Sequence, residues 1–163
     1  MLKIELADNI IVMIDVVFDC NLCELEATDK YGAIKELTSK TESLKSLSSL
    51  EQFQDSVIKR EEEMSTGLGE GVAIAHGNCE ESKKLIVALG ISHKGIEYNS
   101  IDNKPVHILF LVANPPDSQN EYLHLLSSIV RLLRQEPFRQ KILNTYDPVL
   151  LNSHLKEYMT LVN

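Results

Sequence analysis

Cysteine is scarce in this chain, and long apolar runs are missing from it. The three cysteines, Cys20, Cys23 and Cys79, are a sparse and odd-numbered set, which argues against a disulfide framework. No apolar run approaches the roughly 20 residues that span a bilayer. Residues 1–5 lack the charged and apolar regions of a signal peptide. We therefore expect a cytoplasmic protein without membrane insertion.

Positive charge is also in short supply. The chain has 16 lysines and arginines against 24 aspartates and glutamates, which gives a formal net charge of -8 at pH 7. Proteins that bind nucleic acid depend on clustered Lys and Arg to neutralise phosphates. The charge balance of this chain argues against nucleic acid as a partner.

The length is enough for one sizeable hydrophobic core but not for two. Of the 163 residues, 44% are hydrophobic and 25% are charged, which predicts one domain over residues 1–163. Strand signals and helix signals alternate along the chain with no repeat and no long linker. This alternation indicates an α/β fold.

The expected elements follow from apolar spacing and capping residues. Strands are expected at residues 9–17, with a break at Asp15, and at 72–75, 85–89 and 106–112. Helices are expected at 29–41 with Thr28 as N-cap, from Ser49 to about Arg60, at 121–134 and 138–144, and after Asp147 with Pro148 at the first helical position. Residues 114–118 predict a turn, and residues 39–49 a solvated loop or helix end.

Residues 60–77 are the most informative segment, because they bring one histidine to a glycine-flanked position at the end of a short apolar strand. Gly67, Gly69 and Gly71 allow a tight turn, and residues 72–75 predict a buried strand. Gly77 leaves amide nitrogens open beside the ring of His76. The alternative interpretation is a glycine-rich turn leading into a core strand that ends in histidine by chance.

This segment resembles the active-site signature of the fructose/mannitol class of phosphotransferase-system enzyme IIA domains, which includes the nitrogen-regulatory enzyme IIA proteins. In that family a helix ending in Arg-Glu is followed by Thr-Gly-x-Gly-x-Gly-[Ile/Val]-Ala-[Ile/Val]-Pro-His-Gly. The similarity continues through residues 87–90, 95–96, 102–112 and 125–133, and is looser before residue 28. The matching residues of the signature are Arg60, Glu61, Thr66, Gly67, Gly69, Gly71, Ala73, Ile74, His76 and Gly77.

The resemblance implies a mixed central β-sheet flanked by helices, as in mannitol-type enzyme IIA, and a phosphoryl carrier with His76 as phospho-acceptor. A neutral imidazole is a good nucleophile, and an ordinary pKa near 6.5 keeps it mostly neutral in the cytoplasm. The phosphoryl oxygens need hydrogen-bond donors. Arg60 is the side-chain candidate, because a guanidinium grips two oxygens in one plane. The backbone amides around Gly77 and Asn78 are the candidates for phosphate binding. Without the resemblance, Arg60 would be interpreted as an exposed helix-end arginine paired with Glu61 or Glu63.

Two positions depart from the family pattern. Ala75 replaces the usual proline before the histidine, which removes a restraint on φ. Tyr122 stands where the family carries a second histidine that is thought to steady the phosphoryl group. A tyrosine hydroxyl donates one hydrogen bond but brings no positive charge at neutral pH. His124 lies two residues later, about 200° around a helix, and is a poor substitute.

The other histidines and cysteines have structural interpretations. His107 is expected as a hydrogen-bonded histidine of the core or of a sheet face, and His93 and His154 are expected in solvent. Cys20 and Cys23 have the spacing of a redox motif or half a zinc site, but the second pair that a zinc site needs is missing. No metal and no cofactor are implied.

Two functional classes remain open at this point. In the first, the resemblance implies a carrier that accepts a phosphoryl group from HPr or its nitrogen-branch counterpart and passes it to an enzyme IIB. In the second, the chain is a regulatory binding module that controls a target protein, with phosphorylation reduced to a switch or lost. The sequence does not decide between sugar transport and nitrogen regulation. Leu68, Ile74 and residues 114–117 are candidates for the partner-binding rim.

Overall fold

The computed structural model describes residues 1–5 and 11–161, in which strands and helices follow one another in runs, and not singly as the alternating signals predict. The strands are β1 Leu2–Glu5, β2 Ile11–Ile14, β3 Val16–Glu24, β4 Gly67–Gly69, β5 Val72–Asn78, β6 Leu85–Ile96 and β7 Val106–Asn114. The helices are α1 Lys30–Lys40, α2 Glu42–Lys45, α3 Leu50–Glu63, α4 Gln119–Leu133, α5 Glu136–Asn144 and α6 Pro148–Leu161.

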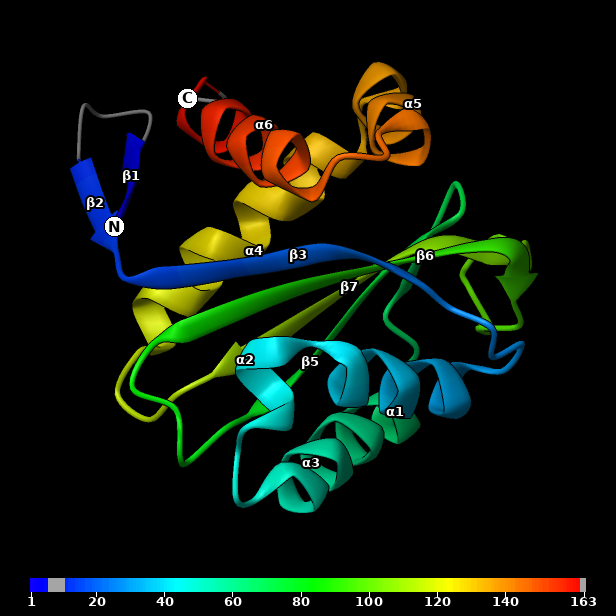
Figure 1. Ribbon diagram of the computed structural model, residues 1–163, viewed down its shortest axis with the longest axis horizontal. Coiled ribbons are helices and arrows are strands. Elements are labelled where there is room, and N and C mark those ends of the chain that lie inside the picture. Colours follow the sequence, from blue (N-terminus) through cyan, green and yellow to red (C-terminus); the bar gives the residue numbers. More distant parts are fainter. Residues whose placement is uncertain (6–10, 162–163) are drawn as a thin grey trace.

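The central sheet is mixed. Its strand order is β3-β6-β7-β5-β4, and β1 and β2 form a separate pair. The β3–β6 and β5–β7 pairs are parallel, whereas the β6–β7 and β4–β5 pairs are antiparallel. Figure 1 shows α1, α2 and α3 on one side of this sheet and α4, α5 and α6 on the other. The α/β fold with a mixed central sheet flanked by helices is therefore confirmed.

Two hydrophobic clusters fill the two faces of the sheet, and β5 contributes to both. Ile74 packs on the side of α4, whereas Ala73 and Ala75 pack on the side of α1 and α3. Successive side chains of a strand point to opposite faces. The same alternation places His76 on the side of α4, while the small residues on the other side let α3 come close to the strand.

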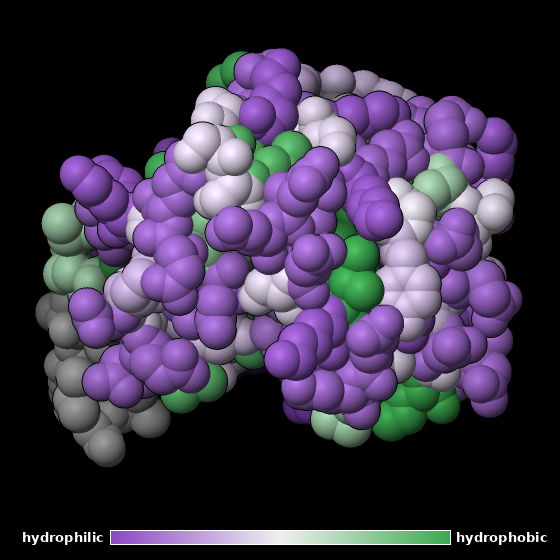
Figure 2. Space-filling model, turned by 90° about the horizontal axis from the view of Figure 1, so that it is seen from below, coloured by the Kyte–Doolittle hydropathy of each residue, from purple (hydrophilic) through white to green (hydrophobic). Residues whose placement is uncertain are grey.

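The helices on the α3 side present polar residues to solvent. Seen from below the view of Figure 1, the surface is mostly hydrophilic, with small and separate hydrophobic patches (Figure 2). Phe53 and Val57, one turn apart on α3, are instead buried against the sheet. Packing of such apolar stripes supplies most of the stability of helices in a fold of this kind. In the part of the chain that the structure describes, no helix is both long and apolar enough to cross a membrane.

The strand expected at residues 9–17 is wrong in its extent. β2 ends at Ile14 and β3 starts at Val16, and the exposed Asp15 between them lies 3.2 Å from the ammonium of Lys84. β3 then joins β6 in the central sheet. Residues 9 and 10 lie outside the described residues.

Several boundaries also differ from the expected ones. The strand expected at 85–89 continues to Ile96, because the exposed His93 and Lys94 interrupt its apolar pattern without ending it. The N-cap of α1 is Asp29 and not Thr28, since the Asp29 carboxylate accepts a hydrogen bond from the Gly32 amide at 2.9 Å. Residues 39–49, expected as a loop or helix end, contain the short helix α2. The start of α6 at Pro148 is confirmed.

The N-terminus of α3 is tied to the loop after β5. The carboxylate of Glu81 accepts hydrogen bonds from the Ser48 and Ser49 amides, both at 2.9 Å, and from the Ser49 hydroxyl at 2.6 Å. These bonds satisfy donors at a helix start that has no side-chain cap of its own. They lower the pKa of Glu81 to about 2.

This depressed pKa predicts an acid-dependent contribution to stability. Because the pKa of Glu81 falls from 4.5 to about 2 on folding, its contribution is present above pH 4.5 and is lost as the pH falls towards 2. Glu81→Gln should lower the melting temperature at pH 7, and the difference from wild type should shrink between pH 4.5 and 2. Thermal unfolding at a series of pH values measures this. Glu80→Gln, on the exposed neighbour, is the control, and a difference that does not change with pH would contradict the prediction.

Candidate functional site

His76 lies near the end of β5, and its ring is half-buried. The ring nitrogen Nδ1 is 3.0 Å from the carbonyl oxygen of Ile74. A carbonyl only accepts hydrogen bonds, so Nδ1 is assigned as the protonated nitrogen. The lone pair of the neutral ring then lies on Nε2.

The surroundings of His76 favour this neutral ring. Burial lowers the pKa of His76 below its ordinary value of 6.5. The hydrogen bond to the Ile74 carbonyl opposes the shift, the positive charge of Arg60 adds to it, and the negative charge of Glu61 opposes it. At neutral pH the ring is therefore an uncharged base with one free nitrogen.

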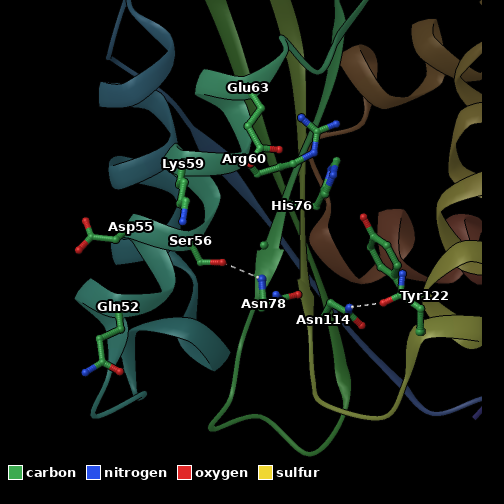
Figure 3. A pocket seen from close by; sticks show the side chains of 12 residues that line it. Gln52, Asp55, Ser56, Lys59, Arg60, Glu63, His76, Asn78, Asn114 and Tyr122 are labelled. Atoms are coloured by element: carbon green, nitrogen blue, oxygen red, sulfur yellow. Dashed lines mark hydrogen bonds between the residues drawn. The ribbon is translucent and has the colours of Figure 1, made fainter.

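His76 opens into a cavity of about 630 Å³ between α3 and the start of α4. Figure 3 shows the guanidinium of Arg60 extending from α3 beside the imidazole, with the ring of Tyr122 on the opposite side. The structure thus brings together the three side chains that the sequence predicts for this site. The lining residues are Gln52, Asp55, Ser56, Lys59, Arg60, Glu63, His76, Gly77, Asn78, Asn114, Gln119 and Tyr122.

Arg60 is positioned by the turn that follows its own helix. Its Nη1 donates a hydrogen bond to the carbonyl oxygen of Met64 at 3.0 Å. Glu61, one of the two partners in the alternative interpretation, points elsewhere: its carboxylate accepts hydrogen bonds from Thr66, and the residue is 2% exposed. Glu63, the other, lines the cavity with Arg60. The guanidinium can therefore present its remaining N–H groups to an anion in the cavity.

Tyr122 is a buried neutral donor. Its ring centroid lies 5.9 Å from that of His76, and the two planes are tilted by 52°. Burial raises the pKa of the Tyr122 hydroxyl above its ordinary value, so the hydroxyl keeps its proton. His124 is not among the described residues that line the cavity, as its place on the helix predicts.

The expected role of the backbone amides after His76 needs correction. The Asn78 amide is not open, because it donates a hydrogen bond to the Ser56 hydroxyl at 2.9 Å (Figure 3). Gly77 is where α3 approaches β5 most closely: a Cβ added there would lie 2.7 Å from Val57 Cγ2 and 2.8 Å from the Val57 nitrogen. A glycine at this position is thus explained by close packing. The side chain of Asn78 remains available to the cavity.

Sequence reasoning missed Asn114 and Gln119. The parallel register pairs Asn78 with Asn114, so the end of β7 lies beside the end of β5. Asn114 is 8% exposed, and its Oδ1 has no hydrogen-bond partner among the described residues. Its Nδ2 donates to Gln119 Oε1 at 3.4 Å, a long and weak bond. From the sequence, Asn114 was predicted only as part of a turn and of the partner-binding rim, because nothing in the sequence reveals the strand register that brings it to the cavity.

The remaining histidines differ in burial and in hydrogen bonding. His107 lies on β7 with Nδ1 2.7 Å from the Ser92 carbonyl oxygen, which confirms a hydrogen-bonded sheet histidine. His93 is exposed, as expected, beside Glu24. His154 is half-buried, and its Nδ1 has no partner among the described residues, so the expectation of a solvated side chain is wrong.

The cysteines and the candidates for the partner-binding rim differ in how exposed they are. Cys20 and Cys79 are buried and Cys23 is half-buried. Within residues 1–5 and 11–161, no group of three or more His, Cys, Asp or Glu side chains is placed to hold a metal ion. Of the rim candidates, Leu68 is 43% exposed, whereas Ile74 is 2% exposed and cannot contact a partner.

Solved structures share this fold. The nitrogen regulatory protein IIA-Ntr from Neisseria meningitidis matches with a TM-score of 0.75 at 24% identity, covering 89% of this chain and 96% of that chain. Enzyme IIA mannitol from Escherichia coli matches with a TM-score of 0.65 at 18% identity, covering 83% of this chain and 95% of that chain. The fold is therefore that of the mannitol-type and nitrogen-regulatory enzyme IIA proteins.

Sequence comparison gives the family. The family described as "Phosphoenolpyruvate-dependent sugar phosphotransferase system, EIIA 2" matches residues 17–158, and the chain belongs to it. The fructose-specific EIIABC component of Bacillus subtilis is 30% identical over 119 residues, which are 73% of this chain and 19% of that protein. The nitrogen regulatory protein of Bradyrhizobium diazoefficiens is 29% identical over 131 residues, 80% of this chain and 85% of that protein. Both sugar-specific and nitrogen-regulatory proteins are thus relatives.

The relatives differ in length from the matched region. The match covers 19% of the Bacillus subtilis component and 58% of the fructose-specific EIIA component of Haloferax volcanii, which is 35% identical over 89 residues. The matched part of this chain therefore spans less than two thirds of the length of either relative.

Close packing at Gly77 is open to a direct test. Gly77→Ala should destabilise the protein by about 1–3 kcal/mol, since the added methyl group overlaps both a side chain and a backbone atom of α3. The free energy of unfolding in urea measures the effect. Val57→Ala removes Cγ2 but not the backbone nitrogen, so the double variant should be more stable than the sum of the two single losses predicts. Strict additivity would show that the two residues are not in contact.

Proposed function

We propose that this chain is a phosphoryl-carrier and regulatory protein of the phosphotransferase system, with His76 as the phospho-acceptor. The observation that carries the proposal is the neutral His76 ring, fixed through Nδ1 and placed between Arg60 and Tyr122 at the cavity mouth. In this arrangement the nucleophile and the donors for a phosphoryl group are present before any ligand arrives.

The proposed transfer needs no metal ion supplied by the chain. The Nε2 lone pair attacks phosphorus, the bond between phosphorus and the donor nitrogen breaks, and its electron pair leaves with the donor imidazole. The attacking ring becomes positively charged, and the Ile74 carbonyl stabilises that charge through Nδ1–H. Arg60 balances the charge on the phosphoryl oxygens, and Tyr122 and Asn78 add neutral donors.

The partners follow from this chemistry. The donor is a phosphohistidine protein, HPr or its nitrogen-branch counterpart, and the proposal places both proteins in the cytoplasm. The acceptor is an enzyme IIB, or else phosphorylation acts as a switch on a regulated target. Two relatives support these alternatives: a solved complex of mannitol enzyme IIA with phosphorylated enzyme IIB from Escherichia coli, and the nitrogen regulatory proteins. We take residues 1–163 as one enzyme IIA domain, of which residues 17–158 match the family.

One observation favours a second candidate function. Tyr122 and the uncharged residues Asn78, Asn114 and Gln119 line the cavity opposite α3, so this wall supplies no positive charge to a phosphoryl group. A regulatory binding module that is not phosphorylated would need no such charge. This alternative predicts the same fold and the same partner surface, with no phosphorylation of His76.

Intact mass measurement separates the two functions. After incubation with phosphoenolpyruvate, enzyme I and HPr, the wild-type chain should gain one phosphoryl group that is lost in acid, because phosphohistidine is acid-labile. His76→Ala should gain none, and His124→Ala should gain the group as wild type does. A wild-type protein that stays unmodified with the HPr of its own organism would favour the binding module.

The role of Tyr122 is tested by transfer rates. Tyr122→Phe removes one hydrogen bond to a charged group, worth about 1.5–3 kcal/mol, so transfer from phosphorylated HPr should slow about 10- to 100-fold. Tyr122→His should restore or raise the rate, since a histidine there can carry positive charge. Tyr146→Phe, on an exposed tyrosine away from the cavity, is the control. An unchanged rate in Tyr122→Phe would show that the hydroxyl does not contact the phosphoryl group.

A further inference from the structure

Glu61 is a buried carboxylate that the proposed reaction does not use. It follows Arg60 on α3 but points into the protein, where it is 2% exposed. Its oxygens accept hydrogen bonds from the Thr66 amide at 2.9 Å, the Thr66 hydroxyl at 2.5 Å and the Tyr98 hydroxyl at 3.3 Å. The ammonium of Lys30 lies 3.7 Å from Oε1. The carboxylate is therefore satisfied on both oxygens.

The turn that Glu61 holds reaches both reacting side chains. Within residues 64–66, the Met64 carbonyl accepts the hydrogen bond from Arg60 Nη1 at 3.0 Å. The Thr66 carbonyl accepts a hydrogen bond from the Ile74 amide at 3.2 Å. The carbonyl of that same Ile74 accepts from His76 Nδ1 at 3.0 Å. Two short hydrogen-bonded paths thus lead from one turn to the guanidinium and to the imidazole.

We propose that Glu61 is a positioning residue for phosphoryl transfer, which sets Arg60 and His76 relative to each other by holding residues 64–66 in place. The inference rests on the proposed function, in which these two side chains act on one phosphoryl group. Transfer depends steeply on such alignment, because an error of about 1 Å costs on the order of 100-fold in rate.

A purely structural role accounts poorly for a charged residue at this position. Burying a carboxylate is costly, and apolar residues of similar volume often stabilise a fold equally well. A carboxylate instead offers two acceptors in a fixed plane, which here bind the amide and the hydroxyl of one residue, Thr66. Ending a helix does not by itself require a buried carboxylate, because a glycine after the last turn commonly ends one. Because both contacts are to the same residue, they fix the orientation of the turn as well as its position.

Lys30 and Tyr98 make the buried charge tolerable. Lys30 is 9% exposed and Tyr98 is fully buried, and the ammonium lies 6.0 Å from the centroid of the Tyr98 ring. Ser65, inside the turn, donates a hydrogen bond to the Tyr98 carbonyl at 2.9 Å. The start of α1 and the segment between β6 and β7 therefore both brace the turn that Glu61 organises.

The experiment compares Glu61→Gln with Glu62→Gln, which removes the same charge from an exposed neighbour on α3. Gln keeps the shape but offers one acceptor in place of two. In Glu61→Gln, kcat for transfer from phosphorylated HPr should fall about 10- to 100-fold, the range usual for residues that orient a reacting group. KM for HPr should stay within about twofold, because a buried residue does not contact the partner. Glu62→Gln should match wild type.

A second readout does not depend on turnover. Titration of His76 by NMR gives its pKa and the ring nitrogen that carries the proton. In Glu61→Gln the pKa should fall below the wild-type value, since a negative charge that raises it is removed. The Nδ1–H tautomer should also lose population as the turn shifts. The tautomer is the readout of positioning, because the pKa falls with the lost charge alone. A merely structural loss would lower the melting temperature and leave the tautomer of the folded protein unchanged.

The outcomes are distinguishable from failure of the proposed function. A folded Glu61→Gln that transfers at the wild-type rate, with the tautomer of His76 unchanged, overturns the inference. If that variant does not fold, Thr66→Val decides: it keeps the Thr66 amide bond to Glu61 and loses the hydroxyl, with its bond to Glu61 and its 3.3 Å contact with the Tyr98 hydroxyl. Its kcat should fall severalfold, and an unchanged kcat overturns the inference. If wild type itself is never phosphorylated, the proposed function fails, and the tautomer of His76 in the two variants then supports or overturns positioning by Glu61.

Discussion

The close contact of α3 with β5 at Gly77 is the constraint on which the rest of the site depends. One residue with no side chain lets the backbone of Val57 come within van der Waals distance of the strand. Ala73 and Ala75 continue the same small surface along β5. Since Arg60 is one turn beyond Val57, this contact sets how far its guanidinium extends past the edge of the strand. The larger residues of β5 are therefore on the other face, where His76 meets α4.

The site combines two cations, both on α3, with several neutral donors on the opposite side. Of the residues lining the cavity, Lys59 and Arg60 carry positive charge, and Asp55 and Glu63 carry negative charge. On the α4 side the cavity is lined by a phenol and carboxamides, which orient an anion but do not neutralise it. On the proposed function, a phosphoryl group held in this way is bound less tightly than one between two cations. Weaker stabilisation of the carrier state favours passing the group on.

Sequence reasoning predicted the fold class from local patterns, and the resemblance to enzyme IIA domains pointed to His76, Arg60 and Tyr122, which the structure places around one cavity. The glycine spacing before His76, the helix that ends after Arg60 and the apolar stripe around Tyr122 each lie in one continuous segment. What it missed depends on pairing between distant segments. Asn114 becomes a cavity residue only through its register with Asn78, and the Asn78 amide is occupied only because Ser56 lies across from it. Short strands such as β4 carry too few residues for a periodic signal.

Helix α3 is fastened to the sheet at both of its ends. Glu81 holds its first turn to the loop after β5, and Glu61 holds its last turn to the residues that lead into β4. Because both ends of α3 are hydrogen-bonded in this way and its middle packs closely against Gly77, the helix has little freedom to slide or tilt against β5. The conformational entropy of aligning Arg60 with His76 is then lost during folding and not at the encounter with another protein. Any adjustment of shape in such an encounter must come from the partner or from the outer loops, which makes this half of the molecule a rigid template.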